Sequence, residues 1–117
     1  MKQLIALDMA GCCGVVHSDG YVDTWQLSQK GDEPKDLRLV RLWDNLTIAH
    51  SLHPFEAIGA EHSAFGSPSG SVKALHNEYL GVLKLFGAMF NCKVYLYYPT
   101  SIKKFAYDNK EQALENL

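Results

Sequence analysis

The sequence predicts an α/β protein built on a mixed five-stranded sheet, with three antiparallel strands followed by two parallel ones, flanked by helices. Three observations predict this class. Strand patterns and a hairpin turn open the chain, a helical period separates the third and fourth strand patterns, and a second helical period precedes the fifth. A strand–helix–strand connection is nearly always a right-handed parallel crossover, so the later strands should run parallel to the first.

The N-terminal part predicts a three-stranded antiparallel meander. Residues 3–9 are almost continuously apolar, as in a central strand covered on both faces. Residues 12–17 and 21–27 have strand composition, and Asp19-Gly20 between them is a strong hairpin signal.

The middle of the chain predicts a helix and a fourth strand. Residues 35–52 place apolar side chains at helical spacing. The helix should end at His53-Pro54, because the residue before proline is pushed out of the α region. Residues 54–61 then form a strand pattern that ends in a carboxylate.

A long helix and a fifth strand follow. Ser67 and Pro68 are suited to the N-cap and first turn of a helix whose apolar face extends to Met89 and Phe90. The opposite, exposed face should carry His76, Leu80, Lys84 and Gly87. Residues 92–98 predict the fifth strand, and 100–106 and 109–117 predict short helical segments.

Composition predicts a single domain over residues 1–117, with 47% hydrophobic and 21% charged residues. Apolar runs are far shorter than the ~20 residues of a membrane span, so we expect a cytoplasmic protein without membrane contact. The three cysteines form no CxxC pair. We therefore expect small buried packing residues rather than disulfides or zinc ligands.

Charge is distributed unevenly along the chain. Residues 1–66 carry nine acidic and five basic side chains, whereas residues 67–105 carry five lysines against Glu78 alone. Two interpretations remain open: solvated helix faces, or a basic surface that meets phosphate beside an acidic pocket.

Two carboxylates end strands that should be parallel neighbours. Asp8 ends the first strand and Glu61 the fourth. Adjacent strands lie ~4.8 Å apart, so both side chains could bind one divalent ion. Mg²⁺ fits best, because few carboxylates hold it and substrate phosphates complete its coordination. Such ions catalyse phosphodiester hydrolysis. Alternatively, Asp8 caps a turn and Glu61 is a solvated strand end.

Four segments in order carry a family resemblance: "IALDMAG", "AIGAEHSAFG", "SPSGSVKALHNEYLGVLKLF" and "VYLYYPTSIKKFA". Together they resemble the RuvC-type Holliday junction resolvases, in their smaller phage and prophage versions, within the ribonuclease H-like superfamily. The resemblance covers about residues 3–106. It implies an RNase H-like fold and a homodimeric, Mg²⁺-dependent endonuclease, with Mn²⁺ as the alternative ion, that nicks four-way or other branched DNA.

The resemblance also implies roles for individual residues. Asp8 and Glu61 match the family's catalytic metal ligands. Lys103 and Lys104 fall in its basic segment after the fifth strand and would meet the DNA backbone. The long helix from Ser71 is in the position that the family uses for dimer and substrate contacts. Under the nuclease hypothesis, we expect Lys73 on this helix to contact phosphate as well.

The chain departs from the family pattern after the fifth strand. Family members continue into a final helix with two more acids, whereas this sequence stops at Leu117, so we expect a C-terminally truncated domain. Glu111 and Glu115, at i and i+4, are either substitute ligands or plainly solvated. His62 is either a proton shuttle or orienting residue beside Glu61, or a solvated loop histidine.

Two other functions compete with the nuclease. A degenerate member would bind branched or duplex nucleic acid without cutting it, because the closing acids are gone. A structural module would dimerise through the apolar long helix and bind no nucleic acid. Cleavage of a synthetic four-way junction in Mg²⁺ or Mn²⁺ discriminates the first function from the others.

Overall fold

The computed structural model of the protein describes residues 3–9, 11–61 and 70–97. The elements run β1 (Leu4–Asp8), β2 (Cys12–His17), β3 (Val22–Gln26), α1 (Leu37–Leu52), β4 (Ala57–Glu61), α2 (Gly70–Phe90) and β5 (Lys93–Tyr97). The predicted fold class is therefore confirmed. Ser67, Pro68 and the helical segments expected at 100–106 and 109–117 lie outside the described residues.

The five strands form one mixed sheet in the order β3-β2-β1-β4-β5. β1 is central: it pairs antiparallel with β2 and parallel with β4. β3 continues the antiparallel side and β5 the parallel side. At the β2–β3 hairpin Gly20 has φ 96°, a conformation that favours glycine. The Asp19 carboxylate accepts a bond of 3.0 Å from the Tyr21 N–H.

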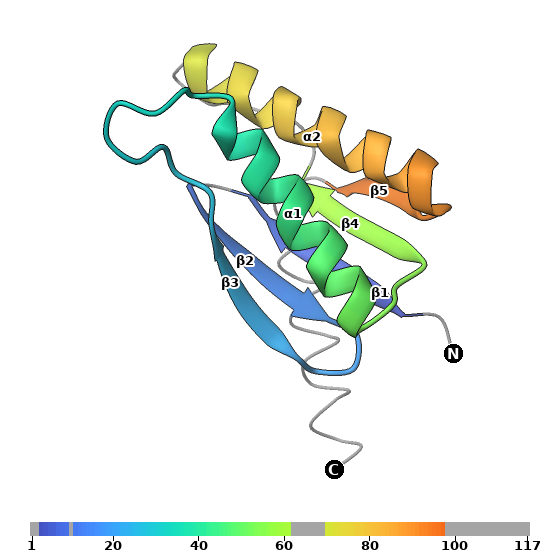
Figure 1. Cartoon of the computed structure of the whole chain (residues 1–117). Helices are drawn as coiled ribbons and strands as arrows, with labels where there is room; N and C mark the ends of the chain where they lie inside the picture. The colour runs from blue at the N-terminus through green and yellow to red at the C-terminus, as the bar shows by residue number, and fades with distance from the viewer. Residues whose placement is uncertain (1–2, 10, 62–69, 98–117) are drawn as a thin grey trace.

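Both helices pack on the same face of the sheet (Figure 1). α1 contacts β3 and α2, and α2 also contacts β4 and β5. Side chains alternate along each strand, so every second residue enters the layer between sheet and helices. The centre of that layer is fully buried, with exposures of 0–1% for Ile5, Leu7, Val15, Ile58 and Leu83. In the described part of the chain, no helix is long and apolar enough to cross a membrane.

The buried face of α2 differs from the sequence prediction. His76 and Leu80, expected on the exposed face, are only 7% and 5% exposed, and Gly87 is buried as well. Met89, expected on the apolar face, is 68% exposed. The reason is that α2 packs against α1 as well as the sheet. The buried arc is thus set by two neighbours, and hydrophobic spacing alone does not locate it.

The three cysteines differ in burial. Cys13 and Cys92 are buried, as predicted, whereas Cys12 is exposed and the prediction was wrong for it. Cys12 and Cys13 are consecutive on β2, so only one of them can face the core. Burial raises the pKa of the Cys13 thiol to about 12, and the nearby charge of Asp8 adds to the effect. Burial also raises the pKa of Cys92.

We expect a thiol-selective reagent to distinguish these three side chains. The thiolate is the reactive form, so burial and a raised pKa should protect Cys13 and Cys92 in the folded protein. At pH 8, Ellman's reagent should modify one thiol rapidly and the other two only in denaturant. Cys12→Ser should remove the rapid phase. A rapid phase that survives this substitution would contradict the assignment.

Candidate active site

Asp8 and Glu61 lie side by side at one edge of the sheet. The parallel register of β1 and β4 pairs Leu7 with Ala60, and one further step places Asp8 beside Glu61. Each is the last residue of its strand. The carboxyl ends of parallel strands are where open α/β sheets place their binding sites. The structure therefore brings together the two carboxylates that the sequence singled out.

The pair belongs to a row of residues that crosses all five strands. Asp8 pairs with Gly14, Gly14 with Thr24, and Glu61 with Tyr97. Residues opposite one another in register share a face of the sheet. Asp8 alternates with the core residue Leu7, so this row lies on the face opposite α1 and α2. A Cβ atom added at Gly14 would lie 3.8 Å from the Asp8 Cβ. The missing side chain at Gly14 thus leaves room beside the Asp8 carboxylate.

A hollow of about 300 Å³ contains both carboxylates. Its described lining residues are Ala6, Leu7, Asp8, Gly14, Val15, Val16, Val22, Asp23, Thr24 and Glu61. Asp8 is exposed and Glu61 half-buried, so neither carboxylate has lost all contact with water. Asp23 also lines the hollow, but its carboxylate accepts bonds from the Thr24 N–H (2.7 Å) and the Trp25 indole N–H (3.3 Å). The Asp23 carboxylate thus accepts hydrogen bonds from two residues of its own strand, β3.

The donor set fits a hard divalent cation. Two adjacent carboxylates in contact with solvent suit Mg²⁺, which keeps several waters and accepts substrate phosphate oxygens as further ligands. Within residues 3–9, 11–61 and 70–97, no group of three or more His, Cys, Asp or Glu side chains could hold a metal ion. His62, Glu111 and Glu115, the auxiliary candidates from the sequence, lie outside the described residues. The described site thus offers two adjacent carboxylates, those of Asp8 and Glu61.

Helix α2 contributes a contact that the sequence did not predict. His76 Nε2 lies 2.9 Å from the backbone carbonyl oxygen of Glu61. This contact brings the N-terminal half of α2 to the edge of the sheet that carries the carboxylates. Lys73 lies one turn before His76 and is exposed, on a helix that packs on the other face of the sheet from the carboxylates. Lys103 and Lys104 are outside the described residues.

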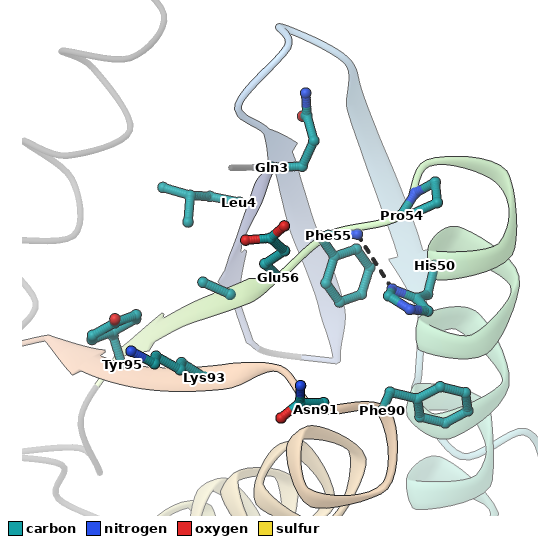
Figure 2. Close-up of a pocket in the computed structure, with 11 residues that line it drawn as sticks. Gln3, Leu4, His50, Pro54, Phe55, Glu56, Phe90, Asn91, Lys93 and Tyr95 are labelled. Atoms are coloured by element: carbon teal, nitrogen blue, oxygen red, sulfur yellow. Dashed lines mark hydrogen bonds between the residues drawn. The ribbon is translucent and has the colours of Figure 1, made fainter. Parts of the chain in front are cut away.

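A larger hollow, of about 720 Å³, lies at the opposite end of the strands. Figure 2 shows its lining residues, which include Gln3 before β1, Glu56 before β4 and Lys93 at the start of β5. There the His50 Nδ1 atom accepts a bond of 3.3 Å from the Phe55 N–H. Glu56 is the one carboxylate among its described lining residues, and Lys93 shares the hollow. This hollow therefore lacks the paired carboxylates of the smaller one.

Two other histidines lie beside the β2–β3 hairpin, away from the carboxylates. His53 stacks on Tyr21 with ring centroids 5.2 Å apart, and His17 meets both rings edge-on. Burial lowers the pKa of His17, which is 4% exposed. These contacts tie the hairpin to the segment between α1 and β4, a packing role.

No protein-family profile and no curated protein matches the sequence. Among solved structures, T. thermophilus RuvC in complex with a Holliday junction substrate superposes with a TM-score of 0.70 at 16% identity, over 89% of this chain and 69% of that one. The fold is RuvC-like. A second Thermus thermophilus RuvC structure gives a TM-score of 0.60 at 21% identity, over 83% of this chain and 64% of that one.

At these identities the likeness to RuvC establishes the fold, and the chain spans about two thirds of the length of both RuvC chains.

Within this RuvC-like sheet, sequence reasoning found Asp8 and Glu61 but missed the row around them. The sequence did contain a signal for this row of residues. The Asp19-Gly20 turn sets the hairpin register, which places Gly14 opposite Thr24. No comparable signal pointed to His76.

Proposed function

We propose that the protein is a divalent-metal-dependent endonuclease of the crossover-junction type, which hydrolyses phosphodiester bonds in branched DNA. The observation that carries this proposal is the position of Asp8 and Glu61. They are adjacent at the carboxyl edge of a parallel strand pair and line one hollow. The RuvC-like fold supports the proposal, since one of the similar structures is RuvC with a Holliday junction substrate.

Each residue at the site would have a distinct task. The carboxylate oxygens of Asp8 and Glu61 would hold Mg²⁺, or Mn²⁺ in its place. When bound, such ions activate water and stabilise the leaving oxygen of a phosphodiester. Asp8 is the exposed member and would face the substrate phosphate, with the room that Gly14 leaves beside it. Lys73 would contact the DNA backbone from α2.

We further propose that the nuclease acts as a homodimer, because symmetric nicking of a junction needs two sites. The exposed apolar side chains of Leu85 (56%) and Met89 (68%) support this part of the proposal. They lie one turn apart on α2 and share one side of that helix. Lys103 and Lys104 remain proposed contacts to the DNA backbone, and the single-domain organisation over residues 1–117 remains an expectation.

One observation favours a second candidate, a degenerate member that binds branched or duplex nucleic acid without cutting it. The described residues would supply two metal ligands, and no group of three or more candidate ligand side chains occurs among them. Such a protein would shift a junction in a gel at low salt and release it as salt rises, because phosphate contacts are electrostatic. It would leave every strand intact.

A nicking assay separates these two functions. The full chain is incubated with a four-way junction labelled in turn on each strand, in Mg²⁺, in Mn²⁺ and in EDTA. The nuclease should give nicks in paired strands in either metal and none in EDTA. Salt-dependent binding with intact strands in both metals would instead support the degenerate candidate.

Gly14→Val should weaken cleavage by filling the space beside Asp8. The added isopropyl group would point into the hollow from the same row. We expect a rate roughly 10- to 100-fold lower, because small displacements at a reacting centre have effects of this size. Gly14→Ala is the matched control. Its Cβ would make an ordinary contact at 3.8 Å, so the rate should remain near wild type. Equal rates for both variants would contradict the space argument.

A further inference from the structure

Helix α2 sends a buried polar side chain to the edge of the sheet that carries the carboxylates. His76 is 7% exposed, and its Nε2 atom lies 2.9 Å from the backbone carbonyl oxygen of Glu61. A carbonyl oxygen only accepts hydrogen bonds, so Nε2 carries the proton and donates. The bond therefore joins α2 to the last residue of β4.

This hydrogen bond lies at the point where the pairing of β4 with β1 ends. Pairing between β1 and β4 ends at Leu7 and Ala60, one residue before Glu61. On the other side, Glu61 still pairs with Tyr97 of β5. Glu61 thus lies where the ladder to β1 stops, and the helix supplies a further hydrogen bond to its peptide group. The direction of the Glu61 side chain depends on the orientation of that peptide group.

We propose that His76 is a positioning residue for Glu61. It holds the end of β4 so that the Glu61 carboxylate stays beside that of Asp8, in place to bind the metal ion. This inference rests on the proposed function, because the carboxylate pair is the feature that it serves. Outer partners of metal ligands commonly act in this way, by orienting the ligand without touching the ion.

The test measures metal affinity directly and needs no cleavage. Mn²⁺ is titrated into the full chain without DNA, and free Mn²⁺ is followed by electron paramagnetic resonance. His76→Leu removes the donor and should weaken Mn²⁺ binding roughly tenfold, the lower end of the range for outer partners of metal ligands. His76→Gln should stay within about threefold of wild type, because its amide nitrogen is as many bonds from Cα as Nε2. His76→Asn, one bond shorter, should not restore affinity.

A second buried position on α2 controls for general loss of stability. Leu83 is fully buried, and its aliphatic side chain has no donor for the Glu61 carbonyl. Leu83→Val should lower the melting temperature and leave Mn²⁺ affinity unchanged. All variants are compared at a temperature where circular dichroism shows them folded.

The outcomes separate this inference from the function on which it rests. If wild type binds Mn²⁺ and folded His76→Leu binds it equally well, His76 only anchors the helix and the inference is wrong, while the metal site stands. If His76→Leu does not fold, equal affinities for His76→Gln and His76→Asn would overturn the inference. If wild type binds no Mn²⁺, the proposed metal site fails and the inference fails with it.

Discussion

Asp8→Asn is expected to reduce metal-dependent nicking of a four-way junction by at least about 10³-fold, equivalent to ~4 kcal/mol of transition-state stabilisation. The amide keeps the shape of the carboxylate but removes the negative charge that would attract the cation. Asp8 is exposed, so the same change should alter the free energy of unfolding by less than about 0.5 kcal/mol. Single-turnover cleavage and thermal melting measure the two effects separately.

Asp23→Asn is the matched control for this substitution. Asp23 lines the same hollow, but its carboxylate is bonded to the Thr24 N–H and the Trp25 indole. We expect its cleavage rate to stay within about threefold of wild type, as for a residue outside the metal site. The assignment of Asp8 would be wrong if Asp8→Asn nicked as fast as wild type.

Gly87→Ala should cause a large loss of stability. The added Cβ would lie 2.6 Å from the Cys92 carbonyl oxygen and 2.9 Å from Val94 Cγ2. The chain turns between α2 and β5 through Asn91, at φ 57°, and the Cys92 N–H bonds back to the Gly87 carbonyl at 2.9 Å. Backbone must therefore move, at a cost of about 2–3 kcal/mol. The melting temperature should fall by roughly 10 °C.

Gly81 offers a matched control on the same helix. A Cβ atom there would meet nothing within 4 Å, and the residue is exposed. Gly81→Ala should raise the free energy of unfolding by about 0.5–1 kcal/mol, because alanine loses less backbone freedom on folding. Thermal or urea unfolding measures both variants. Equal destabilisation by the two would contradict the claim that the close approach of Gly87 to β5 makes that position sensitive.

Much of the fold follows from local signals in the sequence. The apolar run before Asp8 predicts the central strand, and the Asp19-Gly20 turn predicts the hairpin. The break before Pro54 predicts the end of α1. Together with the handedness of parallel crossovers, these signals place β4 beside β1 and hence Glu61 beside Asp8. The carboxylate pair was therefore predictable from the sequence.

The features that escaped prediction depend on more than one neighbour at a time. The role of His76 depends on how α2 turns between α1 and the sheet, which the spacing of apolar residues leaves open. Cys12 and Cys13 are chemically alike, and only the register of β2 decides which one faces the core. The importance of Gly14 becomes visible only when its cross-strand partner Asp8 is known.

The central claim is that Asp8 and Glu61 together hold one divalent ion, and a double-mutant cycle on Mn²⁺ affinity tests it most directly. Wild type, Asp8→Asn, Glu61→Gln and the double variant are titrated with Mn²⁺ under identical conditions. If both carboxylates bind the same ion, each single change should weaken binding strongly, and the double change should weaken it by less than the product of the two. Affinities that multiply independently, or single variants that bind as well as wild type, would contradict a shared site.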